Sequence, residues 1–117
     1  MKTKLKPVVA RVGDAVVSVS VMRDHFITAK PLAHLYAAIT SCVAIHVKKA
    51  VDKLGLSVEE VSVAMGGELV DAVLISIDLT IDIGQEHPYG KTLEAAALNC
   101  QVIQHLDPEI KIRINVL

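Results

Sequence analysis

The 117-residue sequence is poor in aromatic residues and has no excess of charge, and both shortages exclude classes of partner. It has no tryptophan, two tyrosines and one phenylalanine, so it lacks the rings on which proteins stack single-stranded nucleic acid. Twelve basic residues against thirteen acidic ones leave a formal charge of −1. Binding to nucleic acid or to an acidic membrane surface draws on a positive field that this balance does not supply. We therefore expect no nucleic-acid partner and no membrane partner.

The sequence also lacks a secretory signal and an apolar run long enough to cross a bilayer. Its basic N-terminus is not followed by a continuous apolar segment. The most apolar stretch, residues 31–47, contains His34, Thr40 and His46 and is shorter than the roughly 20 apolar residues of a spanning helix. Only two cysteines are present, far apart in the chain, which does not indicate a disulfide scaffold. We expect a cytoplasmic protein with free thiols.

Apolar residues, in contrast, are abundant for a chain of this length. They make up 52% of the sequence, and the mean hydropathy is +0.48. A domain of this size buries only about two thirds of its unfolded surface, so one small core does not hide this much apolar surface. The composition predicts a single domain over residues 1–117 that associates with a second copy of itself.

Alternation of apolar and polar residues predicts most of the strands. Valine-rich segments at residues 3–12 and 15–21 are separated by Gly13 and Asp14, a pattern typical of two strands and a tight turn. Residues 24–28 fit a third, short strand. Residues 57–65 form a further predicted strand, and Gly66 and Gly67 indicate a hairpin or loop after it. The strictest alternation covers residues 73–83, and residues 111–117 form the last predicted strand.

Two helices complete the predicted order. Pro31 is suited to a first helical turn and Gly55 to a helix stop, which predicts a helix over residues 32–54. A second helix is predicted over residues 91–106, after a loop at residues 84–90. The resulting order, β-β-(β)-α-β-β-α-β, indicates an α+β fold with a buried central helix. The first half of that helix is apolar on nearly every face, so we expect a second subunit to cover one side of it.

The two cysteines lie in the predicted helices, Cys42 in the first and Cys100 near the middle of the second. Free cysteine is among the most buried residue types, so both could be small core residues. Alternatively, their small neighbours leave room for a substrate or for contact between the two sulfur atoms. His46 follows Cys42 by one helical turn and shares its face, either as a base or imidazolium partner of a thiolate or as a buried, hydrogen-bonded histidine.

Other candidate sites are not supported by the sequence. Cys42 and His46 supply two ligands, whereas a structural zinc needs four, so we expect no metal. The Gly90-Lys91-Thr92 triplet lacks the first glycine of a phosphate-binding loop, and no glycine-rich dinucleotide fingerprint occurs, so we expect no cofactor. Asp78 and Asp82 alternate along a predicted strand, which is typical of a solvated sheet face.

The segments around the two cysteines resemble the osmotically inducible protein C/organic hydroperoxide resistance (OsmC/Ohr) family. The run PLAHLYAAITSCVAIHV has the spacing of that family's central-helix motif, and EAAALNCQVIQHL has that of its second cysteine segment. The resemblance covers residues 15–117. In register with the first motif are Pro31, Leu35, Ala37, Ala38, Ser41 and Cys42, and with the second Asn99, Cys100 and Val102.

The resemblance implies an intertwined homodimer with active sites at its interface. It implies a thiol-dependent hydroperoxide reductase of oxidative-stress defence, in which Cys42 is the peroxidatic thiolate and Cys100 the resolving thiol. The implied substrate is an organic hydroperoxide and the implied reductant a dithiol. Two family positions differ, since Leu32 replaces a carboxylate that holds an activating arginine and Gln101 replaces a proline.

These differences leave two hypotheses. In the first, the protein is a peroxidase whose activating guanidinium comes from Arg11 or Arg23, with His46 as a substitute local base. In the second, it is a catalytically impaired dimer of the same fold that binds an apolar small molecule in the interface pocket.

Overall fold

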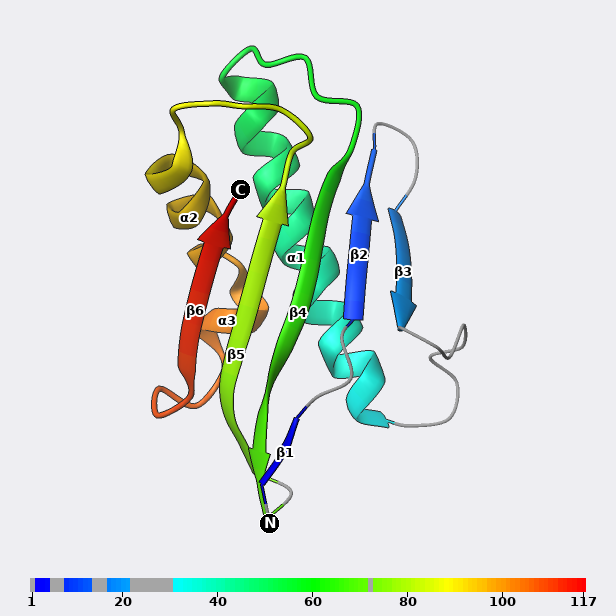
Figure 1. The fold of residues 1–117 in the computed structure, drawn as a ribbon, viewed down its shortest axis with the longest axis vertical. Helices are drawn as coiled ribbons and strands as arrows, with labels where there is room; N and C mark the ends of the chain where they lie inside the picture. Colours follow the sequence, from blue (N-terminus) through cyan, green and yellow to red (C-terminus); the bar gives the residue numbers. More distant parts are fainter. Residues whose placement is uncertain (1, 5–7, 14–16, 22–30, 72) are drawn as a thin grey trace.

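The structure, a computed structural model, describes residues 2–4, 8–13, 17–21, 31–71 and 73–117. These residues form six strands and three helices (Figure 1). In chain order the elements are β1 (Lys2–Lys4), β2 (Val8–Val12), β3 (Val17–Val21), α1 (Pro31–Lys53), β4 (Val61–Val70), β5 (Val73–Asp82), α2 (Gly90–Leu98), α3 (Gln101–Gln104) and β6 (Lys111–Val116). The predicted α+β class is confirmed, whereas the strand predicted over residues 24–28 lies outside the described residues.

The strands form one mixed sheet. Its order is β3-β2-β4-β5-β6, and β1 pairs with one end of β4. All pairs are antiparallel except β5 with β6, which are parallel. Parallel neighbours need a crossover connection, and here α2 and α3 supply it. The predicted hairpin before α1 is confirmed by the β2–β3 register, in which Val12 faces Val17.

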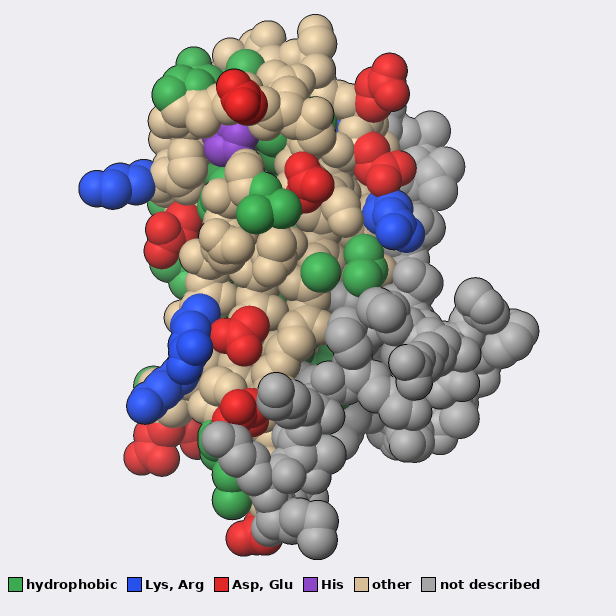
Figure 2. All heavy atoms as spheres, in the orientation of Figure 1, with side chains coloured by type: hydrophobic (Ala, Val, Ile, Leu, Met, Phe, Trp, Pro, Cys, Tyr) green, Lys and Arg blue, Asp and Glu red, His purple; other side chains and the backbone are tan. Residues whose placement is uncertain are grey.

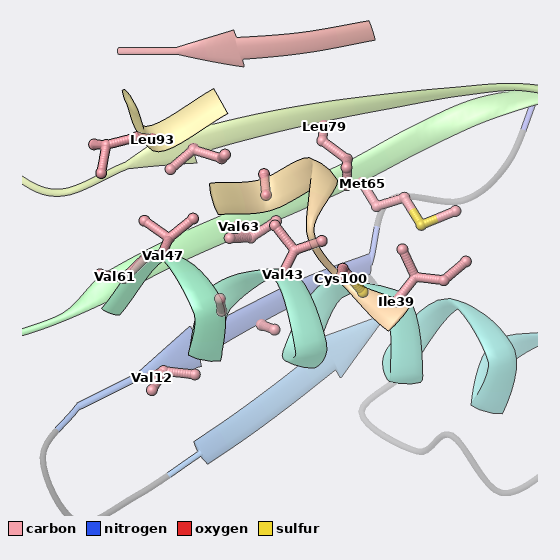
Figure 3. Close-up of a cluster of buried hydrophobic side chains, with 14 of the residues drawn as sticks. Val12, Ile39, Val43, Val47, Val61, Val63, Met65, Leu79, Leu93 and Cys100 are labelled. Atoms are coloured by element: carbon pink, nitrogen blue, oxygen red, sulfur yellow. The ribbon is translucent and has the colours of Figure 1, made fainter. Parts of the chain in front are cut away.

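All three helices cover the same face of the sheet, as Figure 1 shows. Between helices and sheet lies one core of mostly aliphatic side chains (Figure 3). The alternation predicted for residues 73–83 places Ile77, Leu79 and Ile81 of β5 in this core. The largest fully buried side chains are Ile39, Met65, Ile77, Leu79, Ile81, Leu93, Val43, Val47, Val51, Val61 and Val63.

The opposite face of the sheet is open and charged. Figure 2 shows side chains of both signs interspersed over it. Arg11 lies 3.6 Å from Glu60, and Arg113 lies 3.9 Å from Asp78. All four side chains are about half exposed or more, so these ion pairs contribute little to stability. The prediction that Asp78 belongs to a solvated sheet face agrees with this arrangement.

The hairpin between β4 and β5 lies later in the chain than predicted. Gly66 and Gly67 do not form a turn, because both continue β4 and pair with Asp78 and Ile77 of β5. The strand also starts at Val61, not at residue 57. Val70 faces Val73, and Asp71 supplies the turn with a positive φ of 51°, a conformation that aspartate tolerates.

Near this turn the sheet edge departs from strict alternation. The β4–β5 register shifts between Glu68 and Leu69, and a bulge of this kind re-aims the residues beyond it. The strand pattern predicts that Val73 is buried, and this prediction is wrong. Beyond the bulge, Val73 is 62% exposed.

The central helix has the predicted bounds to within one residue. It ends in a Schellman motif, in which Leu56 donates its N–H to the carbonyl of Val51 and Gly55 donates to that of Asp52. Gly55 has a φ of +74°, the left-handed conformation that this cap requires. No helix in the described ranges is long and apolar enough to cross a membrane.

The last helix is broken where the sequence predicts continuity. Instead of one helix over residues 91–106, α2 ends at Leu98 and α3 starts at Gln101. Asn99 stays near helical geometry, but Cys100 has a ψ of 122° and leaves it. Asparagine favours such a break because its side chain competes with backbone hydrogen bonding. Cys100 therefore lies between two helices and not in the middle of one.

Candidate functional site

Cys42 lies on the outward side of α1, at the margin of the core. Residues at positions 35, 38, 42 and 45 fall on one stripe of the helix, because side chains three and four apart share a face. Leu35 is 38% exposed, Ala38 is exposed, and Cys42 and Ile45 are half-buried. We call these four residues the α1 stripe. In the part of α1 whose burial is described, the α1 stripe is thus the less buried side of the helix, and Cys42 on it is partly accessible.

Cys100 is placed opposite α1 by the break between α2 and α3. Its side chain is fully buried and points toward α1 near Ile39 and Val43 (Figure 3). Cys100 is the N-cap residue of α3. The backbone N–H groups of Ile103 and Val102 lower the pKa of Cys100 in part, but its side chain forms no cap hydrogen bond.

The two thiols are in contact. The side chain of Cys42 is close enough to influence that of Cys100, and both cysteines are free thiols. Burial, and after it the neighbouring Cys42 thiol, raises the pKa of Cys100 from an ordinary 9.0 to about 11. A raised pKa means that the folded protein favours the protonated form of Cys100. The structure thus places a half-buried thiol beside a fully buried thiol that keeps its proton at neutral pH.

His46 lies one turn beyond Cys42 on the same helix and is half-buried. Its ring has no hydrogen-bond partner among the described residues. The described residues therefore do not show His46 as a buried histidine that is fixed by a hydrogen bond. Its ring nitrogens are available to a substrate or a thiolate partner.

Of the arginines proposed from the sequence, the structure describes Arg11, which does not lie beside Cys42. Arg11 lies on the open face of the sheet beside Glu60, and the helices, with Cys42, lie on the other face. Arg113 is also on the open face, next to Asp78. Arg23 lies outside the described residues. Leu32 belongs to the first turn of α1, which carries no acidic residue, and Gln101 is the exposed first residue of α3.

Two buried polar groups on α1 were not singled out by the sequence analysis. Tyr36 is only 7% exposed, and its hydroxyl has no hydrogen-bond partner; burial raises the pKa of this phenol. Lys48 is buried and donates its Nζ to Asp52 Oδ1 at 2.7 Å. The i, i+4 spacing of Lys48 and Asp52 was a readable signal for this pair, but nothing in the sequence distinguishes a buried lysine from an exposed one.

No metal centre forms in the part of the chain that the structure describes, since no group of three or more potential ligands gathers there. An open pocket of about 430 Å³ lies where β4 begins and β5 ends. Its acidic side chains are Glu59, Glu60 and Asp82, and neither cysteine lines it. The thiol pair is therefore the best-defined chemical feature of the described residues.

The raised pKa of Cys100 predicts a loss of stability at alkaline pH. The unfolded chain gives up this proton near pH 9 and the folded chain near pH 11. The contribution of the protonated Cys100 to the free energy of unfolding is therefore fully present below pH 9. It is lost as the pH rises toward 11, which lowers the free energy of unfolding by on the order of 2 kcal/mol. We expect urea midpoints, measured under reducing conditions, to fall across this range in the wild type.

The matched control for this prediction is Cys100→Ala. Burial also raises the pKa of Tyr36, so both proteins lose some stability as the phenol ionises. The alanine variant should nevertheless show a shallower decline between pH 9 and 11, whatever its stability at pH 7. Parallel declines in the two proteins would contradict the assignment of this loss to Cys100.

This fold, with a thiol pair between its central helix and its last helices, defines an α+β protein with a candidate redox site. The chain matches the family model described as OsmC-like protein over residues 24–115. Because the match spans most of its length, the protein belongs to the OsmC-like family. The resemblance drawn from the cysteine segments is confirmed at this level. No match was found among curated proteins.

Solved structures support the same fold. An OsmC-like protein from Mycoplasma pneumoniae superposes with a TM-score of 0.64 at 17% identity, covering 100% of this chain and 94% of that one. A protein described as an osmotic stress induced and detoxification response protein, from Psychrobacter arcticus 273-4, superposes with a TM-score of 0.61 at 16% identity. The second alignment covers 86% of this chain and 87% of the other. At these identities the similarity concerns the fold.

Proposed function

We propose that the protein is a thiol-dependent hydroperoxide reductase that acts on organic hydroperoxides. The observation that carries this proposal is the contact between a half-buried Cys42 and a fully buried Cys100. Two contacting free thiols with unequal access supply both a site of attack and a partner for its oxidised product. Membership of the OsmC-like family and the description of one structural relative as a detoxification response protein support the same activity.

The chemistry proceeds in two steps within the protein. The Cys42 thiolate attacks the outer oxygen of ROOH, the O–O bond breaks, and protonation of the leaving alkoxide gives ROH and a sulfenic acid. The sulfur of Cys100 then displaces the hydroxyl group, which leaves as water with the Cys100 proton, and a disulfide forms. An external dithiol returns both cysteines to thiols and is itself oxidised to a disulfide.

The difference in accessibility supports the proposed roles of the two cysteines. A peroxide reaches Cys42 from the outward side of α1, whereas Cys100 has no exposed surface. Leu35, Ala38 and Ile45 flank Cys42 along the α1 stripe, and apolar neighbours favour the alkyl group of an organic peroxide over hydrogen peroxide. His46, one turn away, is the nearest candidate base on the same face.

A homodimer would explain why the outward side of α1 carries apolar residues that the single chain leaves partly exposed. The α1 stripe is a row of apolar residues with the spacing of a helix-packing seam, and Leu98 of α2 is a further large apolar residue with 43% exposure. A second copy that covers this surface would enclose Cys42 and create an apolar site between the subunits. Such a dimer also gives the excess of apolar residues a buried location.

A second candidate function follows from the arginines. Because Arg11 is paired with Glu60 on the opposite face of the sheet, the protomer does not bring it to Cys42. The same fold without an activating cation would be a dimeric protein that binds an apolar small molecule beside Cys42.

A Leu32→Glu variant distinguishes these two functions. Glutamate at this position would supply a carboxylate in the first turn of α1, where negative charge is also favourable for the helix. If the reductase lacks only a carboxylate to hold an arginine, its rate of hydroperoxide consumption should rise about tenfold, the value of one charge-assisted hydrogen bond. Leu32→Gln is the uncharged control and should stay near the wild-type rate.

The assay follows the loss of cumene hydroperoxide with a dithiol in excess. An unchanged rate in Leu32→Glu, together with saturable binding of apolar ligands, would favour the binding protein over the reductase.

A further inference from the structure

The loop between β5 and α2, residues 83–89, is tied to the end of β6 by His87. Because β5 and β6 are parallel, both strands end at the same edge of the sheet, where this loop begins (Figure 1). His87 Nε2 lies 2.8 Å from the backbone oxygen of Leu117. The N–H of Leu117 in turn donates to the carbonyl of Ile81 at 2.9 Å. The imidazole therefore joins the loop to a residue that the sheet already holds in place.

The same ring also holds the start of α2. The backbone N–H of Tyr89 donates to His87 Nδ1 at 3.1 Å, and Tyr89 is the N-cap residue of α2. A side chain that accepts the N–H two residues further on forms the bond of an Asx turn, and here an imidazole supplies the acceptor. The two rings are parallel, with their centroids 6.5 Å apart, within the range of a stacked pair. His87 thus bridges the last strand and the helix that leads to Cys100.

Both contacts require the same neutral form of the ring. A backbone N–H only donates, so Nδ1 must offer its lone pair to Tyr89. A backbone oxygen only accepts, so Nε2 must carry the proton that it shares with Leu117. Neutral imidazole has one ring nitrogen of each kind and satisfies both contacts, whereas a doubly protonated ring satisfies only the second.

We propose that His87 is a pH-sensitive clasp at the start of α2. When Nδ1 binds a second proton, it becomes a donor, and two N–H groups then face each other at the Tyr89 contact. A charge on the ring strengthens the bond from Nε2 to the Leu117 oxygen, so protonation frees the start of α2 but leaves the loop attached to β6. Histidine is the side chain that ordinarily changes its charge between about pH 5 and 8, and the release is expected in this range.

The charges around the ring do not oppose this release. His87 forms no ion pair with a charged side chain in the described ranges, and residues 115–117 at the end of β6 carry none. The charged side chains on the surrounding segments are all exposed, so water screens their effect on the ring; they are Asp82, Glu86, Lys91 and Glu94. The positive end of the α2 dipole lies beside the ring and disfavours an imidazolium at the Tyr89 contact.

Release of Tyr89 loosens the first turn of α2. The carbonyl of Tyr89 accepts the N–H of Leu93 at 2.9 Å, and Leu93 is fully buried in the core. A clasp at this position makes the beginning of the crossover from β5 to β6 sensitive to pH. The inference does not depend on the proposed reductase function, because it uses only the contacts of His87.

The test is an NMR titration of the reduced, isotope-labelled wild-type protein between about pH 8 and pH 5. At the alkaline end, the ring nitrogen shifts of His87 should show a protonated Nε2 and an unprotonated Nδ1. As the ring becomes doubly protonated, the Tyr89 amide should lose about tenfold of its protection from hydrogen exchange, the value of one hydrogen bond. The exchange rates are corrected for the intrinsic effect of pH.

His87→Asn is the matched variant. Its Oδ1 can accept the Tyr89 N–H as in an ordinary Asx turn, but it does not titrate. Protection of the Tyr89 amide should therefore be independent of pH in this variant. His105→Asn controls for a histidine elsewhere, since His105 Nδ1 lies 2.7 Å from the carbonyl of Gln101. That variant should keep the wild-type response at Tyr89.

A Tyr89 amide whose protection does not follow the titration of His87 in the wild type would overturn the proposal. A neutral His87 ring with its proton on Nδ1 would do the same, as would a His87→Asn variant that keeps the wild-type response to pH. The wild-type titration needs no substitution, so it decides even if a variant fails to fold. No peroxide is used, and the reductase function is judged separately by hydroperoxide consumption.

Discussion

Replacement of Cys42 by serine should reduce the consumption of organic hydroperoxide to the rate of the protein-free reaction. The serine hydroxyl remains protonated at neutral pH and cannot attack the O–O bond as a thiolate does. The substitution is nearly isosteric, and Cys42 is half-buried on the margin of the core, so the fold should be retained. The measurement is cumene hydroperoxide loss in the presence of excess dithiol.

Ser41→Cys in the Cys42→Ser background is the matched control. It places a thiol one position away on the same helix, where Ser41 Oγ donates to the carbonyl of Ala37 at 2.6 Å. A displaced thiol does not face Cys100, so this protein should be as inactive as Cys42→Ser. Wild-type consumption by Cys42→Ser would exclude Cys42 as the peroxidatic residue.

Replacement of Cys100 by serine should stop the reaction at the sulfenic acid. With one equivalent of hydroperoxide and no external thiol, the wild type should form a disulfide, whereas this variant should accumulate a Cys42 sulfenic acid that dimedone traps. With excess hydroperoxide, the wild type is protected as the disulfide, but the variant proceeds to the irreversible sulfinic and sulfonic acids. Activity should therefore recover with dithiol in the wild type and be lost permanently in the variant.

Mass spectrometry of the Cys42 peptide distinguishes these products. His46→Gln, which keeps both cysteines, should still form the disulfide even if it does so more slowly. Reversible oxidation of Cys100→Ser, with no sulfenic acid trapped, would contradict the resolving role of Cys100.

Much of the fold can be predicted from the sequence, wherever the local residue pattern matches the environment of the element in the folded protein. The alternation over residues 73–83 predicts β5 because one of its faces packs against helices and the other is wet. Gly66 and Gly67 mislead, since paired glycines favour a turn locally. In the structure β4 has neighbours on both sides, and those ladders outweigh the weak local preference. The turn between β4 and β5 instead depends on Asp71, and no sequence pattern indicates that this residue adopts a positive φ.

The candidate site is only partly readable, for a related reason. Ala95, Ala96 and Ala97 favour helix so strongly that the break after Leu98 has a single local signal, Asn99. Contact between Cys42 and Cys100 depends on that break and on how α3 docks, which no spacing encodes; the family resemblance supplied the pairing. The position of Arg11 was readable, because it alternates with the buried Ala10 and Val12 and so belongs to the opposite face of β2.

The central claim is that an organic hydroperoxide oxidises the Cys42–Cys100 pair within one chain. The most direct test is peptide mass spectrometry of the reduced protein before and after one equivalent of cumene hydroperoxide, with hydrogen peroxide in parallel. We predict that the organic peroxide removes both free thiols, joins the Cys42 and Cys100 peptides from one chain, and reacts faster than hydrogen peroxide. Two thiols that remain reduced, or a disulfide that joins separate chains, would contradict the account.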